Sequence, residues 1–216
     1  MNQILIYKGL EETAFKKNRK SVFVYFFYIS ILLFILTLLY LCVYYYKLNQ
    51  NNIKSKNLLQ SFNISSLYAN NNKYNSSYMY TTQNLDSFVI GIIEIDKINL
   101  HYPILSYSTE SNLKISPCRF AGPMPNEVGN ICIACHNNID NSFFGKLNLL
   151  NNGDIVKIYD ISGNMVKYSI YEKYEVLNTD FSCASQDTYG QKIVTLMTCN
   201  SLKDTRIIFR AAEITT

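Results

Sequence analysis

The sequence predicts a mainly β domain that follows a single membrane-spanning helix. Three observations support this prediction: an uninterrupted apolar run near the N-terminus, a polar stretch after it, and then short apolar runs separated by turn residues. Such short runs are typical of an antiparallel β domain. These changes in composition divide the chain into a basic tail (1–20), a transmembrane helix (21–46), a polar stalk (47–86) and a β domain (87–216).

The N-terminal apolar run is long enough to cross a bilayer. Residues 21–46 contain no charged residue, no Pro and no Gly, and at about 1.5 Å per residue a helix of this length spans the roughly 30 Å hydrocarbon core. A cleaved signal peptide has a shorter apolar centre of about 7 to 15 residues and ends in small residues. Here the run ends in Tyr44-Tyr45-Tyr46, so we expect the helix to be retained.

Charge predicts how this helix is oriented. The tail carries five Lys and Arg against Glu11 and Glu12 (5 − 2 = +3), out of a net charge of +4 for the whole chain. By the positive-inside rule the N-terminus stays in the cytoplasm and the β domain lies outside the cell. The expected location is the cell membrane, as a single-pass protein with the bilayer as a partner. The nearly neutral remainder lacks the concentrated basic face that nucleic-acid binding requires.

The stalk is rich in Asn, Ser, Gln and Tyr. Such a segment buries too little apolar surface to offset the entropy lost on ordering. Its scattered apolar residues could still let part of it form a helix that docks on the β domain. They are Ile53, Leu58, Leu59, Phe62 and Leu67.

Seven apolar runs of the β domain are candidate strands. They are Phe88–Ile95, Ile98–Tyr102, Asn130–Ala134, Asp154–Asp160, Met165–Val176, Lys192–Thr198 and Arg206–Ala212. The segment 142–150 has apolar residues at 143, 144, 147 and 150, a spacing that predicts a short helix.

Three residues near the ends of these runs provide the chemistry for acyl transfer. Cys199 supplies a thiol, which attacks a peptide carbonyl effectively only as the thiolate. His136 can exchange protons near neutral pH, so it can serve the thiol and the leaving amine. Arg206 is always protonated and can stabilise the oxyanion that forms on the attacked carbonyl.

The order and spacing of these residues resemble the sortase family of membrane-anchored cysteine transpeptidases. In that family a TLxTC box closes one strand, an Arg opens the next, and a His follows a short apolar strand. The matching segments are Thr195–Cys199, Thr205–Phe209 and Ala134–Asn137, within a resemblance that covers roughly residues 88–212. Most members place Gly directly before the His, whereas this chain has Cys135 there.

This resemblance implies a closed β-barrel and a catalytic set of His136, Cys199 and Arg206. We expect no cofactor and no metal-ligating residues. The resemblance also implies that the enzyme cleaves an LPxTG-like sorting signal of surface proteins. The product is then transferred to an amine acceptor, which is a cell-wall precursor or a pilin. The span between His136 and Cys199 lacks the helical insertion of class B, and no pilin-type lid motif precedes residue 88. We therefore expect a class D or class A-like member.

Two other residues compete for these roles. Arg210 lies four residues after Arg206, and in a strand this spacing puts both on the same face. The position just before an apolar run favours Arg206, and we expect Arg210 to be a surface or barrel-rim residue. His101 has no match in the family pattern, so we expect it to be structural.

The stretch from Cys132 to His136 also spells C-x-x-C-H, the pattern of covalent c-type haem attachment. Its neighbours predict a buried strand, where residues three apart point to opposite faces. The same geometry places the two α-carbons about 10 Å apart, too far for a disulfide. A zinc site would need a second pair of ligands at metal spacing, and none is present in the sequence. The sequence leaves the thiol states of Cys118 and Cys183 open.

Two alternatives to a transpeptidase remain at this stage. One is a cysteine peptidase that passes its thioester only to water. The other is a membrane-tethered binding or structural β domain in which Cys199 is buried and inert.

Overall fold

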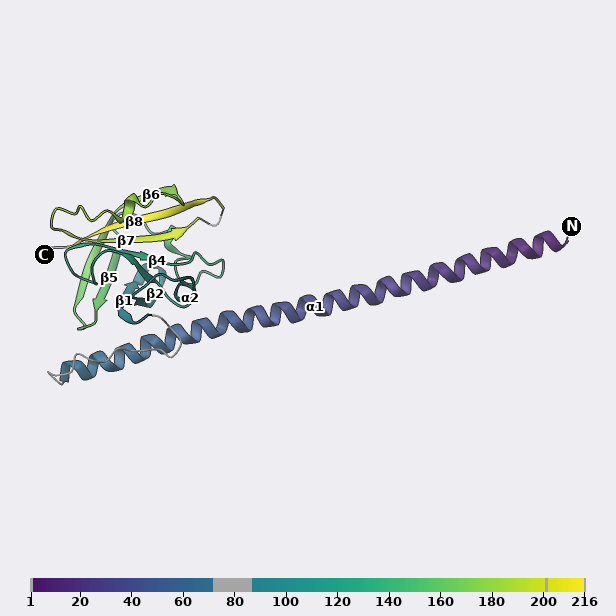
Figure 1. Cartoon of the computed structure of the whole chain (residues 1–216), viewed down its shortest axis with the longest axis horizontal. Helices are drawn as coiled ribbons and strands as arrows, with labels where there is room; N and C mark the ends of the chain where they lie inside the picture. The colour runs from purple at the N-terminus through teal and green to yellow at the C-terminus, as the bar shows by residue number, and fades with distance from the viewer. Residues whose placement is uncertain (1, 72–86, 201, 216) are drawn as a thin grey trace. The chain divides into compact units, whose positions relative to one another are not determined.

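A computed structural model describes residues 2–71, 87–200 and 202–215, with side chains in the N-terminal helix described for residues 22–60. The chain divides into two compact units, residues 1–50 and 51–216 (Figure 1). A single helix, α1 (Asn2–Asn71), accounts for the first unit and continues into the second, which otherwise consists of a β domain.

Helix α1 contains the predicted membrane span. Within Val22–Gln60 the helix is long and apolar enough to cross a membrane, with a mean hydropathy of 2.7. Ser30 and Thr37, inside the apolar run, bond back to their own helix: Ser30 Oγ donates to the Phe27 carbonyl at 2.8 Å, and Thr37 Oγ1 to the Phe34 carbonyl at 2.7 Å. Such internal bonding is what a hydrocarbon environment requires of polar groups.

The helix does not end where the apolar run ends. It continues through the first part of the predicted stalk to Asn71, a segment with neither Pro nor Gly to interrupt it. Leu58 is buried there among Val89, Ile92 and Leu105, and Leu59 packs beside it, whereas Ile53 is exposed. The side chains of Phe62 and Leu67, also expected to dock, lie outside the described residues.

Eight strands form a closed barrel, which confirms the predicted fold class. The strand order around the barrel is β1-β2-β3-β4-β7-β8-β6-β5, and β5 pairs with β1 to close it (Figure 1). The bounds are β1 Val89–Ile95, β2 Leu100–Leu105, β3 Cys118–Ala121, β4 Gly129–Ala134, β5 Ile155–Asp160, β6 Met165–Leu177, β7 Lys192–Cys199 and β8 Thr205–Glu213. Seven of these strands correspond to the predicted ones, and β3 is an addition.

Helical structure in the second unit is short apart from the end of α1. It consists of α2 (Glu110–Leu113) and the 3-10 turns η1 (Asp96–Ile98), η2 (Leu147–Leu149) and η3 (Ser182–Ala184). The prediction of a helix over 142–150 was therefore wrong, except that the single turn η2 lies within this segment. Asn141 (φ 62°) and Phe143 (φ 53°) adopt left-handed backbone conformations that a right-handed helix cannot include. The Phe144 amide instead donates to the His136 carbonyl at 3.0 Å, which folds this segment back toward the histidine.

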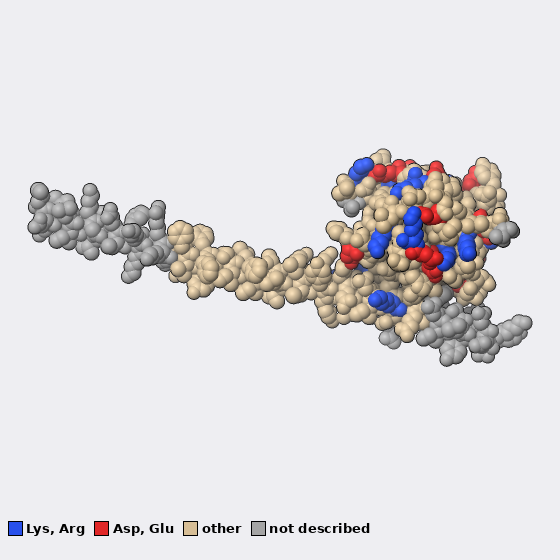
Figure 2. Space-filling model, turned by 180° about the vertical axis from the view of Figure 1, so that it is seen from behind, with Lys and Arg blue, Asp and Glu red and all other residues tan. Residues whose placement is uncertain are grey.

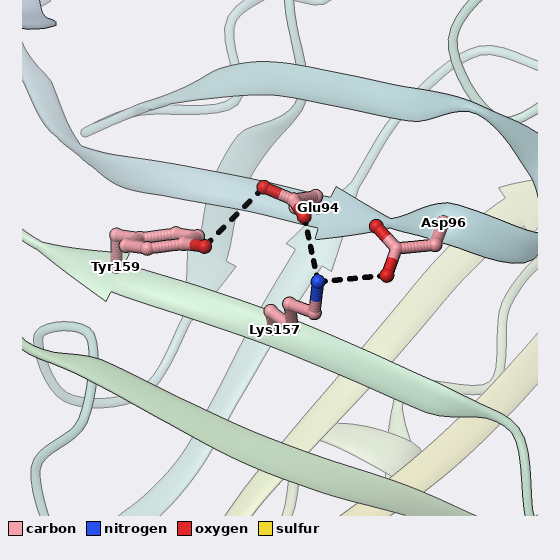
Figure 3. Close-up of polar contacts among 4 residues, drawn as sticks. All are labelled: Glu94, Asp96, Lys157 and Tyr159. Atoms are coloured by element: carbon pink, nitrogen blue, oxygen red, sulfur yellow. Dashed lines mark hydrogen bonds and ion pairs between the residues drawn. The ribbon is translucent and has the colours of Figure 1, made fainter.

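The outer surface of the barrel carries charges of both signs, which are interspersed on the face seen in Figure 2. One cluster joins β1 to β5 (Figure 3): Lys157 Nζ lies 2.8 Å from Glu94 Oε1 and 2.7 Å from Asp96 Oδ2, and the Tyr159 hydroxyl donates to the other oxygen of Glu94. The hydrogen bonds to Asp96 and Glu94 raise the pKa of Lys157, and the contact with Lys157 lowers the pKa of Asp96. Lys157 thus forms ion pairs with both carboxylates where β1 and β5 close the barrel.

Candidate active site

The three candidate catalytic residues come from three adjacent strands. β7 lies between β4, which runs parallel to it, and β8, which runs antiparallel. Cys199 and Arg206 are direct partners across β7 and β8. Ala134 pairs with Met197, so His136, two residues further along, comes level with Cys199. The topology brings together residues that are 63 positions apart in the sequence (199 − 136).

These residues lie on the outer face of the barrel wall. Side chains alternate along a strand, and the inward positions of β7 and β8, such as Leu196 and Phe209, belong to the main core. The outward positions Met197 and Ile208 instead pack against Cys183 of the β6–β7 connection. Cys199 and Arg206 continue this outward series, so the site is on the outer surface rather than inside the barrel mouth.

Backbone and side-chain bonds fasten the His136 segment to the Cys199 strand. The Cys135 amide donates to the Met197 carbonyl at 3.1 Å, and Thr198 Oγ1 donates to the Cys135 carbonyl at 2.8 Å. On the other side of the histidine, Asn137 Nδ2 donates to the Cys199 carbonyl at 2.9 Å. Both neighbours of His136 are thereby tied to the strand that carries the thiol.

Cys135 takes the place that Gly has in most sortases without strain. Its backbone is not among the left-handed non-glycine conformations of the described residues, and its thiol is buried in the core. Because this position does not adopt a left-handed backbone conformation, it does not require Gly. The departure from the family pattern therefore leaves the path of the chain into His136 intact.

Burial sets the protonation state of His136. The imidazole is half-buried, and its loss of hydration lowers its pKa below the ordinary 6.5 because the charged form is disfavoured. The charge of Lys114 lowers this pKa further, while that of Glu110 in α2 raises it. Since the pKa lies below 6.5, the resting imidazole is neutral at pH 7 and able to accept a proton.

The charges of Lys114 and Glu110 predict changes in the pKa of His136 that can be measured without an activity assay. Lys114→Gln removes a positive charge near His136 and is expected to raise the pKa of the imidazole, whereas Glu110→Gln is expected to lower it. NMR titration of the His136 ring resonances measures both, with His101 as an internal reference. Shifts in the same direction for the two variants would contradict this account of the site.

Cys199 differs from the other cysteines of the barrel. Cys118, Cys132, Cys135 and Cys183 are all buried free thiols, whereas Cys199 is exposed. Burial raises the pKa of Cys118 and of Cys132 to about 12, and those of Cys135 and Cys183 also rise. The exposed thiol is the one best placed in the barrel to act as a nucleophile.

This contrast predicts the order of alkylation. When the full chain in lipid nanodiscs is treated with iodoacetamide at pH 7.5, Cys199 is expected to be modified before any other thiol of the barrel. At a pKa of about 12, Cys118 and Cys132 hold only a minute fraction of thiolate, on the order of one in 10⁴ or less. Peptide mass spectrometry identifies the sites, and a denatured sample serves as the control in which all barrel thiols react. Earlier labelling of Cys118 or Cys132 would refute the assignment.

The surroundings of Arg206 differ from those of Arg210. Arg210 Nη1 lies 3.9 Å from Glu172 Oε2, and its guanidinium lies over the ring of Tyr171. Among the described residues no carboxylate pairs with Arg206, and its Nη1 is buried without a hydrogen-bond partner. Arg206 is therefore not engaged by a carboxylate as Arg210 is, although Arg210 Nε is also buried without a hydrogen-bond partner among the described residues. Arg210 is half-buried on the same outer face rather than at a barrel rim.

The remaining sequence candidates lie elsewhere or form no site. His101 is exposed on β2 opposite Glu94, and β2 is not adjacent to β7. Cys132 lies within β4 and Cys135 directly after it, with both thiols buried. This arrangement does not suit attachment of a haem edge to both sulfurs. Within the described part of the chain, no three His, Cys, Asp or Glu side chains are grouped so as to hold a metal ion.

Comparison with known proteins agrees with this geometry. The model of a protein family described as the sortase domain matches residues 93–214, more than half of the chain. The chain belongs to the sortase family. The match includes all three candidate catalytic residues and all but the first part of β1 among the strands of the barrel.

Individual sortases resemble the chain over different lengths. Sortase A of Bacillus anthracis is 31% identical over 117 residues, so the chain spans about half (54%) of this relative's length. The solved structure of the Clostridium perfringens sortase D5 transpeptidase has a TM-score of 0.63 and 27% identity, and the match covers 76% of this chain and all of that one. A sortase C of Clostridium perfringens, solved with the C-terminal cell wall sorting motif, matches with a TM-score of 0.55 and 18% identity over 74% and 89% of the two chains. The last likeness concerns the fold alone.

The sequence analysis missed several residues around this candidate site. Asn137, which binds the Cys199 carbonyl, directly follows His136 and could have been considered for that reason. Phe181 lies against the Arg206 guanidinium, but it belongs to an irregular connection with no motif. The buried Asn130 donates to the Cys183 carbonyl of that connection, and it lies at the start of β4, where the sequence analysis assigned it no role.

Proposed function

We propose that this chain is a membrane-anchored sortase that cleaves an LPxTG-like sorting signal and transfers the new acyl end to an amine. Two observations together carry the proposal. Cys199 of β7 pairs directly with Arg206 of β8, and both neighbours of His136 are hydrogen-bonded to β7. Thiol, imidazole and guanidinium can supply the nucleophile, the proton transfer and the oxyanion stabilisation that acyl transfer from a peptide requires.

In the first half-reaction the neutral His136 imidazole accepts the proton of the Cys199 thiol. The resulting thiolate attacks the carbonyl carbon of the sorting-signal Thr, and the electron pair of the C=O bond moves onto oxygen. Arg206 donates hydrogen bonds to this oxyanion. When the carbonyl re-forms, the C–N bond breaks and the His136 imidazolium protonates the departing amine. The products are a Cys199 thioester and a free amine.

In the second half-reaction an incoming amine attacks the thioester carbonyl. His136, neutral again, accepts a proton from the attacking nitrogen, and Arg206 stabilises the second oxyanion. The C–S bond then breaks, and the Cys199 sulfur leaves as thiolate and regains a proton from His136. Water in place of the amine gives hydrolysis by the same steps.

The comparisons support the substrate class without assigning a specific signal. One similar structure holds a C-terminal cell wall sorting motif, and sorting-signal peptides are therefore the first substrates to test. The connections between His136 and Cys199 contain only β5, β6 and short 3-10 turns, which agrees with a class D or class A-like member. A cell-wall precursor and a pilin Lys are the two candidate acceptors.

The apolar part of α1 supports membrane anchoring. The basic tail that precedes it supports an N-terminus in the cytoplasm and a barrel outside the cell. The sorting signals and amine acceptors of surface proteins are available on that side.

The test uses the full chain in lipid nanodiscs with a fluorescent LPxTG-type peptide, with and without an added amine. We expect cleavage between Thr and Gly, a thioester adduct on Cys199, and an amine-dependent transfer product detected by mass spectrometry. Hydrolysis alone, unchanged by the amine, would identify a cysteine peptidase instead. Absence of both products and of the adduct, across peptides that vary the first two positions of the signal, would favour a binding domain.

A further inference from the structure

We infer that Phe181 is a positioning residue that holds the Arg206 guanidinium by its flat face and leaves its N–H edge free for the oxyanion. The inference rests on the proposed acyl transfer. The guanidinium carbon of Arg206 lies 4.5 Å from the centre of the Phe181 ring, within the range of a cation–π contact. No carboxylate among the described residues engages Arg206, so this ring is the contact that orients it.

An aromatic face orients a guanidinium differently from a carboxylate. A carboxylate forms parallel hydrogen bonds with the N–H edge and occupies the donors that an oxyanion needs. A ring attracts the cation through its π face and uses none of these donors. Consistent with this arrangement, Nη1 of Arg206 has no hydrogen-bond partner among the described residues.

A second aromatic ring packs on the other side chain of this contact, Phe181. Phe120 of β3 stacks on Phe181 with ring centres 5.5 Å apart and planes 11° from parallel. The two rings remain 36% and 46% exposed, so they do not belong to the hydrophobic core. In the barrel order β4 and β7 lie between β3 and β8, and the row of Phe120, Phe181 and Arg206 therefore extends over the strands that lead to His136 and Cys199.

The chain segment around Phe181 is fixed to the barrel wall. Its carbonyl accepts from the Ala184 amide at 2.9 Å, which forms η3. The side chain of the buried Asn130 in β4 donates to the Cys183 and Ser185 carbonyls at 2.9 and 3.0 Å, and its Oδ1 accepts from Thr195 Oγ1 at 2.8 Å. Asn130 thus anchors the turn that follows Phe181 to both β4 and β7, which keeps the ring in place over Arg206.

The decisive experiment replaces Phe181 in the full chain with phenylalanines that carry one, two or three ring fluorines. Each fluorine weakens the negative potential of the π face while the ring keeps nearly the same size. We expect kcat for acylation to fall stepwise with KM unchanged, because the oxyanion contact exists only in the transition state. Phe181→Leu is expected to lower kcat about 2- to 30-fold, the range of cation–π contacts, and Phe181→Tyr to restore it.

A parallel measurement is independent of catalysis. Ring currents move protons that lie over an aromatic face upfield, so the Arg206 side-chain N–H resonances are expected to be shifted upfield in the wild type and in Phe181→Tyr. The shift should be lost in Phe181→Leu. If the wild type shows this shift but forms no thioester, the proposed function fails while the stacking remains. If fluorination leaves kcat unchanged, or if KM rises instead, Phe181 does not position Arg206 for the transition state.

Discussion

Cys199→Ala is expected to abolish both cleavage and transfer of an LPxTG-type peptide. Without the sulfur no thioester can form, and loss of a catalytic nucleophile typically lowers kcat by about 10⁴-fold or more. Cys199 is an exposed residue at the end of β7, so its replacement should leave the barrel intact. The measurements are the rate of peptide cleavage and the mass of the adduct on the protein.

The matched control is Cys118→Ala. Cys118 is also a free thiol at a strand end, but it is buried in a separate cluster with Leu105 and Ile115. This variant should lose some stability through the small cavity that it creates and yet form the adduct at a rate close to that of the wild type. Persistent transfer by Cys199→Ala would contradict the proposed mechanism outright.

Arg206→Ala is expected to lower kcat about 10²- to 10³-fold with a small change in KM, as removal of an oxyanion donor does elsewhere. Arg206→Lys keeps the charge but loses the planar fork, so it should recover only part of the rate. The measurement is the steady-state rate of acylation over a range of peptide concentrations.

Arg210→Ala provides the comparison for this second prediction. Arg210 lies on the same face of β8, but its side chain is engaged by Glu172 and Tyr171 rather than placed opposite Cys199. We expect its kcat to remain within a few-fold of the wild type. A loss of rate from Arg210→Ala as large as that from Arg206→Ala would show that the guanidinium role has been assigned to the wrong residue.

Much of the barrel could be predicted because its strands carry strong local signals. The apolar runs that became β1, β4, β7 and β8 are bounded by turn residues, and each observed limit differs from the expected one by at most one residue. The pairing of Cys199 with Arg206 also follows from local sequence, because a short connection between two strands makes them antiparallel neighbours.

Other features depend on contacts that local patterns do not contain. β3 is only four residues long and exists because Arg119 and its neighbours pair with β4. The segment 142–150 has helical spacing, but its backbone follows contacts with the His136 segment and with Tyr102. The stack of Phe120, Phe181 and Arg206 joins three distant segments, and its parts carry no common motif.

Helix α1 extends beyond the apolar run for a related reason. The composition rich in Asn and Ser predicts a polar stalk, but its scattered apolar residues allow a docked helix, and burial of Leu58 against β1 and β2 supplies this tertiary stabilisation. The predicted boundary at residue 46 marks the end of the apolar character rather than the end of the helix.

The position of β8 in the barrel links complete synthesis to reactivity. β8 is the last strand in the sequence and fills the gap between β6 and β7. A nascent chain that stops before Thr205 carries the thiol on an unpaired edge, with neither the neighbouring strand nor the guanidinium in place. The proposed acyl transfer therefore requires the C-terminal strand, because Thr205–Glu213 supplies both the partner of β7 and the guanidinium opposite Cys199.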